Sequence, residues 1–454
     1  METNLNNSVF IKFVNNCLNF TQTKTSFFTK NSLFIQNIDI FINIFAVLTL
    51  IVSTFLDSEK IGLVMLLGFG LLLCKYLFKP KTQITINSFD VWATVYVLLF
   101  CLATLWSSWM FDSIHGLIKV LIYFFGYWTF RELFKANPKL KIAYIALIAI
   151  LSSIQGFIGI YQNLFHVEAL AGWQDMENIN PEEIMTRVFG TLKPLNPNLL
   201  AGYLIATIPT TLGCTFYDFK NKKVNSIAAI GLLATFLTIV FTGCRGSYLA
   251  LMAQLVLFSA ISGHLIWHDF KDRPYLKKIW SNTFILGAFA IVAVVLTEPS
   301  LQKRVCSIFA KRDDSSNSFR MNVYHSSFRM FCDNALCGIG VGNWTFREVY
   351  GLYMRTAFDA LGAYCVPLEI AVETGILGLI NFIAFIITSI ITAIKKIISQ
   401  IAYNQKIIIS ITLISIVGMM VHGIVDTVWF RPQIQFIFWM MIAILGTASD
   451  EVSQ

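Results

Sequence analysis

Apolar stretches long enough to cross a bilayer recur along most of this chain. A membrane-spanning helix needs about 20 predominantly apolar residues. The stretches that approach or meet this length are residues 37–56, 61–78, 90–107, 113–130, 142–162, 197–216, 226–243, 246–264, 281–297, 372–394, 407–424 and 433–449. The pattern predicts an all-α polytopic membrane protein of about 12 transmembrane helices.

These stretches divide the chain into two membrane parts, two tails and one long polar insert. Residues 1–36 have no apolar core followed by a small-residue cleavage site, so we expect a cytoplasmic tail rather than a removed signal peptide. We expect about nine helices in residues 37–297 and about three in residues 372–449. Residues 298–371 are predicted to form a large periplasmic loop, and residues 450–454 a cytoplasmic tail.

Basic residues gather in every second connection between the apolar stretches. They are Lys75, Lys79 and Lys81; Arg131, Lys135, Lys139 and Lys141; Lys220, Lys222 and Lys223; Lys271, Arg273, Lys277 and Lys278; and Lys395, Lys396 and Lys406. The other connections are short or acidic. Because cytoplasmic loops carry the excess of Lys and Arg, both termini are expected in the cytoplasm and the large insert outside.

Composition agrees with a membrane protein and argues against other classes. Hydrophobic residues make up 56% of the 454 residues and charged residues 13%, too few to coat a water-soluble globule of this size. The formal charge of +8 follows from the clustered topology signals, so we expect no nucleic-acid partner. The nine cysteines include no CxxC pair, and a disulfide or free thiols are both open for Cys306, Cys332, Cys337 and Cys365 in the insert.

Arginines on the predicted outer face are the first candidates for a binding site. Arg245 lies between two glycines in FTGCRGSYLAL at a membrane boundary, where it either snorkels or meets an anionic partner. The insert adds Arg304, Arg312, Arg320, Arg329, Arg347 and Arg355. Planar guanidinium groups suit bidentate capture of phosphate or diphosphate. The sequence therefore predicts an anion-binding surface on this face.

Glycines and asparagines mark two turns on the same face. GIGVGNW, from Gly338 to Trp344, resembles an anion-binding glycine loop but lacks the Lys-Ser/Thr end of a nucleotide motif, which favours a tight re-entrant turn. Asn196 and Asn198 flank Pro197 at the start of a predicted helix. Asn196 is either the helix N-cap or, together with Asn198, a ligand-binding residue.

Titratable pairs supply candidates for proton transfer. Glu369 and Glu373 lie four residues apart, on one helical face near the outer boundary, and serve either as a proton acceptor or as partners of an arginine. His422 and Asp426 repeat this spacing, either as a proton relay or as a carboxylate that orients an imidazole.

His264 and His268 have the helical spacing of metal ligands but no Glu between them, and they lie on the predicted inner face. We expect neither a metal nor a cofactor.

Four segments together resemble the O-antigen ligase and polymerase superfamily. They are NPNLLAGYL, TGCRGSYLAL, the Arg320 segment that leads to GIGVGNW, and LEIAVETGILGL, in the family's order over roughly residues 180–430. The resemblance implies a bacterial inner-membrane protein that transfers a glycan from an undecaprenyl diphosphate carrier to a glycan or lipid acceptor, without metal or nucleotide. It also implies diphosphate contacts at Arg245 and Arg320, and we add Arg187 to them.

AGWQDMENINPEEIMTRVFGTLKPLNPNLLAGYL and ALGAYCVPLEIAVETG look most like a cyanobacterial branch named for inorganic-carbon (bicarbonate) transport. The wealth of Ile, Phe, Asn and Lys fits a small-genome cyanobacterium, or a plastid membrane if the chain is plastid-encoded.

One departure from the family concerns its essential His-Asn pair, which is replaced here by Tyr364 and Cys365. A tyrosine with an ordinary pKa near 10 is a poor general base. Either Glu369 or Glu373 takes that role, or this branch does not run the ligase reaction.

Three functions remain open: a binder of lipid-linked glycan that also transfers it, an anion transporter, and a non-catalytic membrane regulator. Arginines at the outer face favour the first, with membrane lipids, a lipid-linked donor and an acceptor as partners.

Overall fold

The computed structural model describes residues 6, 8–29, 32–167, 187–297, 302, 315–356 and 358–450. Within these ranges, every regular element is a helix. Each predicted apolar stretch overlaps one of the following: α4 (Ile38–Val52), α5 (Ser58–Phe78), α6 (Ser88–Trp106), α7 (Met110–Ala136), α8 (Leu140–Leu164), α9 (Pro197–Phe216), α10 (Ser226–Phe241), α11 (Arg245–Asp269), α12 (Tyr275–Thr297), α16 (Val366–Ile398), α17 (Tyr403–Gly423) and α18 (Pro432–Asp450).

Seven of the helices in the described residues are long and apolar enough to cross a membrane: α5, α6, α8, α9, α11, α16 and α17. Shorter apolar helices are α4, α10 and residues Pro432–Ala448 of α18. The all-helical, polytopic class is therefore confirmed. The count of twelve spans stays a prediction.

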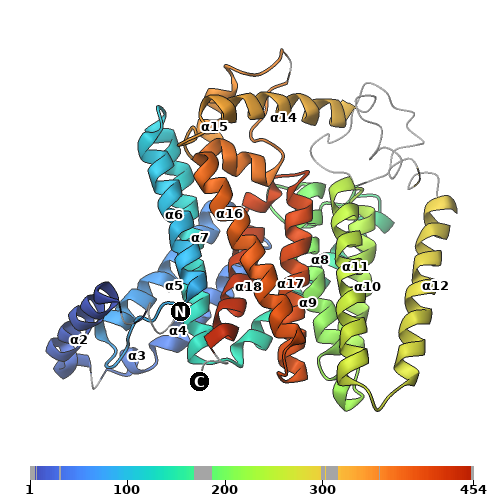
Figure 1. Cartoon of the computed structure of the whole chain (residues 1–454), viewed down its shortest axis with the longest axis horizontal. Helices are drawn as coiled ribbons and strands as arrows, with labels where there is room; N and C mark the ends of the chain where they lie inside the picture. The colour runs from blue at the N-terminus through green and yellow to red at the C-terminus, as the bar shows by residue number, and fades with distance from the viewer. Residues whose placement is uncertain are drawn as a thin grey trace.

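The long helices stand side by side, and α14 (Ser315–Asp333) lies across one end of them (Figure 1). Helix α17 packs against α9, α11, α16 and α18, and α9 also packs against α8 and α10. Most side chains of α9 and α17 are buried in the bundle. A helix that is apolar on all sides is stable in this position because neighbouring helices surround it.

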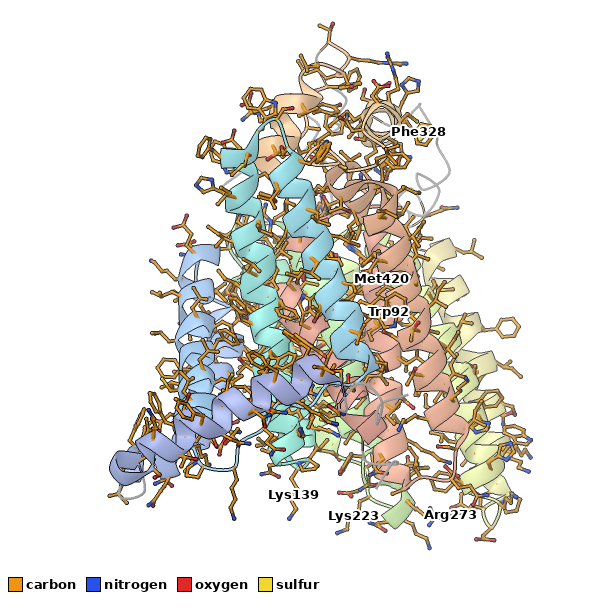
Figure 2. All side chains as sticks on the ribbon, turned by 60° about the vertical axis from the view of Figure 1, so that its left-hand side comes forward. Trp92, Lys139, Lys223, Arg273, Phe328 and Met420 are labelled. Carbon is orange, nitrogen blue, oxygen red and sulfur yellow. The ribbon has the colours of Figure 1, made fainter. Side chains whose placement is uncertain are left out.

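The two ends of the bundle differ in charge. Lys139, Lys223 and Arg273 project from one end, and Phe328 of α14 lies at the opposite end (Figure 2). We call these the basic end and the α14 end. The basic connections thus share one end, as the sequence predicts, and the assignment of that end to the cytoplasm stays a prediction.

The predicted N-terminal tail contains two helices, α2 (Val9–Thr29) and α3 (Leu33–Gln36). Helix α2 packs against α5 and is tied to the connection that leads into α6. The Asn15 amide exchanges two hydrogen bonds with the backbone of Ile84, and the Gln22 amide donates to the carbonyl of Thr82. Amide side chains that satisfy backbone groups in this way hold α2 on the bundle.

The predicted large loop is largely folded where the structure describes it. Helices α14 and α15 (Asn343–Tyr350) share a small core that includes Val323, Met330 and Phe346. Helix α16 begins at Val366, with Pro367 in its first turn, six residues before the predicted span at 372–394. Residues 298–301 and 303–314 lie outside the described residues.

The cysteines of this segment are free thiols at Cys332, Cys337 and Cys365, so the disulfide option fails for these three. Cys306 lies outside the described residues.

Helix α16 is broken at Gly375, where φ is +70° and ψ is −169°. The break frees backbone groups, and a neighbouring segment pairs with them. The amide of Ile376 donates to the carbonyl of Ala335 at 2.7 Å, the amide of Ile339 to Val372 at 2.9 Å, and that of Gly340 to Glu373 at 3.1 Å. Irregular backbone near the membrane is stable only where other protein groups satisfy it in this way.

The GIGVGNW segment forms the other half of this contact. Gly338, Gly340 and Gly342 all have positive φ, and a Cβ on Gly338 would lie 2.3 Å from the carbonyl oxygen of Glu373. The backbone N–H groups of Gly338 to Gly342 all donate within the protein: to Asn334, Val372, Glu373, Ser113 and the Glu373 carboxylate. The segment is therefore a tight re-entrant turn, and its N–H groups are not available to an anion.

Substituting Gly375 by Ala tests the break. A side chain with this φ and ψ costs about 1–3 kcal/mol, and the new Cβ would lie 2.4 Å from the carbonyl oxygen of Leu336. We expect Gly375→Ala to lower the melting temperature in detergent. The matched control is Gly70→Ala in α5, where no atom lies within 4 Å of the new Cβ. Because alanine favours a helix over glycine, this variant should stabilise the protein by up to about 1 kcal/mol. An unchanged melting temperature for Gly375→Ala would contradict this account.

Candidate functional site

A polar cluster at the α14 end joins two arginines through one amide and one carboxylate. The guanidinium of Arg187 donates to Oδ1 of Asn198 at 2.6 Å, and the Asn198 amide donates to Oδ2 of Asp426 at 3.1 Å. A guanidinium nitrogen of Arg320 lies 3.5 Å from the same Asp426 oxygen. Four residues that are far apart in the sequence thus form one connected group.

Helix ends position these side chains. Asn196 caps α9 by accepting the Asn198 backbone N–H at 2.8 Å, as its place before Pro197 predicts. Asp426 lies three residues beyond the end of α17, and its Oδ1 accepts the N–H of Val428 at 3.1 Å. Arg320 reaches the cluster from α14, in the predicted outer segment. The cluster forms only because α14 lies over the ends of α9 and α17.

The TGCRG turn packs directly against Arg187. The Arg187 Nε donates to the carbonyl of Thr242 at 2.7 Å. Gly243 has φ +60°, and a Cβ there would lie 3.5 Å from Arg187 Cγ. Arg245 is the first residue of α11, directly after this turn. Its backbone therefore adjoins the cluster, and a contact between its guanidinium and a ligand stays a prediction.

His422 and Cys244 form a buried pair beside the cluster. Nε2 of His422 lies 3.6 Å from Sγ of Cys244, and both residues are buried. The last turn of α17 approaches two glycines closely: a Cβ on Gly202 would lie 3.4 Å and one on Gly246 3.6 Å from the His422 ring. Asp426 is engaged instead by Asn198, Arg320 and Val428. Although Asp426 lies four residues after His422 in the sequence, its side chain therefore binds these other groups rather than the His422 ring.

Tyr364 lies at the edge of this cluster, in the turn before α16, with φ +52°. Its ring packs edge-on against Phe319 at 5.6 Å, and its carbonyl accepts the Tyr324 hydroxyl at 3.2 Å. Burial raises the pKa of the Tyr364 phenol above 10, and the negative charge of Asp426 adds to the rise. At neutral pH an even smaller fraction of Tyr364 is therefore deprotonated here than in water, so it is poorly suited to accept a proton.

The two carboxylates of α16 are buried and hold backbone groups. Glu369 Oε2 accepts the N–H of Ala363 at 3.0 Å, and Glu373 Oε1 accepts the N–H of Gly342 at 2.7 Å. Glu369 also interacts electrostatically with Asp426, whereas Glu373 interacts with Lys119. Glu369 therefore borders the cluster, and Glu373 belongs to the contact with the glycine turn.

Arg329 lies apart from the cluster. It is exposed on α14, nine residues after Arg320. Nine residues at 100° each place it on the opposite face of the helix. It lies near Tyr353, whose hydroxyl donates to Oδ2 of Asp333 at 2.9 Å.

Two residues of the site were not selected from the sequence. Arg431, in the short connection before α18, interacts electrostatically with Glu369. The sequence offered one indication of Arg431: it is a basic residue in a predicted outer connection, and the topology rule places few basic residues there. Cys244 lies inside the TGCRG motif, but nothing in the sequence indicates that His422 would lie beside it.

The chemistry of the cluster favours an anion. Two guanidinium groups, those of Arg187 and Arg320, meet in the cluster, and the Arg320 side chain is 19% exposed. Partial burial strengthens the attraction for an anion because fewer waters screen it. Among the described residues, no group of three His, Cys, Asp or Glu is placed to hold a metal ion. The rings of His264 and His268 lie with their centroids 4.4 Å apart and are tilted by 36° to each other.

Part of the chain matches a known family. Residues 230–383 match the family model described as O-antigen ligase. This supports the resemblance to the O-antigen ligase superfamily. The ligase-like region contains Arg245, Arg320, Tyr364 and Glu369, whereas Arg187, Asn198 and Asp426 lie outside it. No curated protein matches the chain. The placement in the inorganic-carbon branch stays a prediction.

Replacing Asp426 by Ala tests whether the cluster is one unit. The variant leaves Arg320 without the carboxylate it pairs with and removes the acceptor of the Asn198 amide. Breaking a largely buried ion pair costs about 3 kcal/mol. The control is Asp359→Ala, which breaks the Arg347–Asp359 pair, exposed by 59% and 57%; that should cost about 1 kcal/mol or less. Thermal unfolding in detergent measures both. Equal effects would contradict a buried, connected cluster.

Proposed function

We propose that this integral membrane protein binds a polyprenyl diphosphate-linked glycan at the α14 end and transfers the glycan to an acceptor. The observation that carries the proposal is the convergence of Arg187 and Arg320 on Asn198 and Asp426. The match of residues 230–383 to the O-antigen ligase family supports the same substrate class.

A diphosphate suits this cluster in charge and geometry. It carries more negative charge than the Asp426 carboxylate and offers more acceptor oxygens. A guanidinium binds two such oxygens in parallel. Bound between Arg187 and Arg320, the diphosphate would take over part of the pairing that Asp426 now supplies. Arg245, at the start of α11, would add a third positive charge from the TGCRG turn.

The location of the charges favours binding at a membrane surface over transport. A transporter places its binding residues near the middle of the membrane, commonly at broken helices from two repeated halves. Arg187 instead precedes α9, Arg245 begins α11, and Arg320 lies on α14, which crosses the end of the bundle. The break in α16 is closed by the backbone of residues 335–340. The resemblance to an inorganic-carbon branch therefore does not require an anion path through the bundle.

The proposed reaction needs charge stabilisation and a proton acceptor. An acceptor hydroxyl attacks the anomeric carbon of the bound glycan, and the bond from that carbon to the diphosphate oxygen breaks. The leaving diphosphate takes the electron pair, and the arginines stabilise its charge. The hydroxyl proton passes to a carboxylate.

Glu369 is the carboxylate that we assign as proton acceptor. It borders Asp426 and Arg431, whereas Glu373 holds the glycine turn. Tyr364 stands where the family has its essential histidine, but its raised pKa keeps the phenol protonated at neutral pH.

Substituting Arg320 by Gln tests binding. Removing one partner of a desolvated charge pair costs a few kcal/mol, so we expect the Kd for a polyprenyl diphosphate to rise roughly 30-fold or more. Arg187→Gln should act alike. The control is Arg347→Gln, which removes an exposed arginine of the same segment. Binding is measured on the full chain in nanodiscs, and an unchanged Kd in both site variants would sink the proposal.

Substituting Glu369 by Gln tests transfer separately from binding. The amide still accepts the Ala363 N–H but cannot take a proton, so turnover should fall about 100-fold with Kd unchanged. Glu373→Gln is the control, because its amide oxygen can still accept the Gly342 N–H, and turnover should stay within about threefold. Glycan transfer to lipid or sugar acceptors is the measurement. A larger loss in Glu373→Gln than in Glu369→Gln would reverse our assignment.

A further inference from the structure

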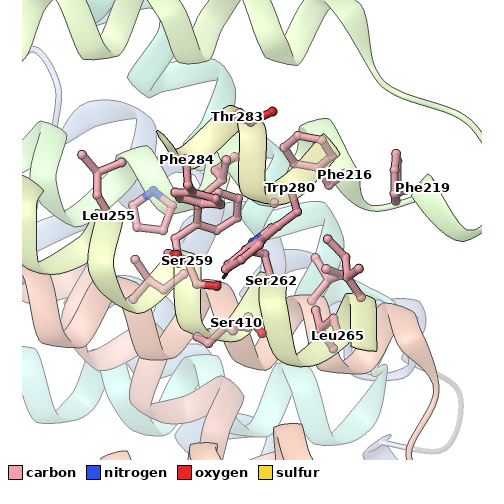
Figure 3. A pocket seen from close by; sticks show the side chains of 18 of the residues that line it. Phe216, Phe219, Leu255, Ser259, Ser262, Leu265, Trp280, Thr283, Phe284 and Ser410 are labelled. Atoms are coloured by element: carbon pink, nitrogen blue, oxygen red, sulfur yellow. Dashed lines mark hydrogen bonds between the residues drawn. The ribbon is translucent and has the colours of Figure 1, made fainter. Parts of the chain in front are cut away.

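An apolar cleft lies between α9, α11, α12 and α17, away from the polar cluster (Figure 3). Its volume is about 740 Å³. Aliphatic and aromatic side chains form most of its walls, and the aromatic ones include Phe216, Phe258, Trp280 and Phe284. Two of its polar side chains are engaged within the protein: Trp280 Nε1 donates to Ser262 Oγ at 3.0 Å, and the Ser410 hydroxyl donates to the carbonyl of Lys406 at 2.7 Å. The cleft therefore suits a hydrocarbon chain and offers little to water.

The cleft opens toward the side of the bundle. Met252, Val256 and Ile279 belong to its lining and are 51%, 68% and 54% exposed. Helix α12, which forms the outer wall, stands at the edge of the bundle (Figure 1). In a membrane this side faces lipid, so a lipid chain can enter without crossing water.

Packed residues separate the cleft from the diphosphate site. Asn198 belongs to the polar cluster, and Pro209 is the first residue of α9 that lines the cleft. Eleven residues of helix correspond to roughly 16 Å along the axis. Between them Leu200, Tyr203 and Leu204 are buried in the bundle. The cleft is thus a second site, nearer to the basic end.

Basic residues surround the end of the cleft. Phe219, Phe270 and Leu276 line it, and each is followed directly by a lysine. These and their basic neighbours are Lys220, Lys222, Lys223, Lys271, Arg273, Lys277 and Lys278. The nearby acids are Asp218 and Asp272, together with Asp269, which pairs with Lys406 at 2.9 Å. Positive charge is in excess at this rim.

Arg273 joins the two connections that form this rim. Its guanidinium donates to the carbonyl of Lys220 at 2.9 Å and lies over the Phe270 ring at 5.5 Å. The residues that follow Phe219 and Phe270 are therefore held near the same opening. Lys220 and Lys271 are exposed there.

We propose that this cleft binds an anionic phospholipid from the leaflet at the basic end, with an acyl chain in the cleft and the phosphate at Lys220 and Lys271. Charge complementarity selects the headgroup, because clustered lysines next to a membrane attract anionic lipids. Apolar burial holds the chain. The lipid would also bridge α12 to the rest of the bundle.

Gly287→Trp fills the cleft from α12. Gly287 lines the cleft, and a Cβ there meets no atom within 4 Å, so the large side chain has room. Gly70→Trp in α5 is the matched control, because Gly70 is equally open and lies outside the cleft. Binding of phosphatidylglycerol and phosphatidylcholine to the full chain is measured by native mass spectrometry.

We expect wild type and Gly70→Trp to bind phosphatidylglycerol about tenfold more tightly than phosphatidylcholine, and Gly287→Trp to lose about tenfold in affinity. The double variant Lys220→Gln/Lys271→Gln should bind the two lipids equally. Unchanged binding in Gly287→Trp, or no preference for phosphatidylglycerol in wild type, would overturn the proposal. So would displacement of phosphatidylglycerol by undecaprenyl phosphate at equal concentration, because the occupant would then be the polyprenyl chain.

A second measurement covers the case in which Gly287→Trp does not fold. Phosphatidylglycerol with brominated chains should quench the fluorescence of wild type more than that of Trp280→Phe, because Trp280 lines the cleft. Trp106→Phe, at the end of α6, is the control. Equal quenching of wild type and Trp280→Phe would overturn the proposal.

Discussion

The exchange of backbone hydrogen bonds between the broken helix α16 and residues 335–342 is the contact on which the α14 end depends. A helix interrupted at this depth leaves carbonyl and amide groups that neither lipid nor helix can satisfy. Here Ala335, Ile339 and Gly340 supply the partners. Only glycine allows two backbones to approach this closely, which explains the positive φ values at Gly338, Gly340 and Gly375.

This contact fixes a polar segment on an apolar bundle and so assembles the cluster. Residues 335–342 connect α14 to α15, and their attachment to α16 holds α14 across the end of the bundle, while α15 packs on α7. Arg320 on α14 then meets Asp426, while Asn198 and Arg187 approach from the bundle. Each of these charged groups is half-buried or buried, and each has a hydrogen-bonding or ionic partner. Such a partner offsets the free-energy cost of removing a charge from water. In the proposed function, an anionic ligand would replace one of these partners.

The helices that carry this cluster also form the proposed lipid cleft, and the chemistry changes along their length. At the α14 end, α9 bears Asn198, and Asp426 lies just beyond α17. Farther along, Pro209 and Ile414 line an apolar cleft whose rim is basic. A donor lipid with a diphosphate and a membrane phospholipid would therefore bind at different depths of the same helices. The two sites differ in what recognises the ligand: guanidinium pairs in one, and hydrocarbon contact with lysines at the rim in the other.

The sequence by itself determined the helices, because apolar runs and basic connections are local patterns that do not depend on how distant segments pack. All twelve apolar stretches overlap a helix, and Asn196 caps α9 as its neighbours predict. It also marked Arg187, Arg320, Asn198 and Asp426 as separate candidates. Only the tertiary structure decided that these four meet and that Glu373 holds the glycine turn. Those outcomes depend on how α14 and the broken α16 lie against the bundle, and contacts between distant segments leave no periodic pattern in a single chain.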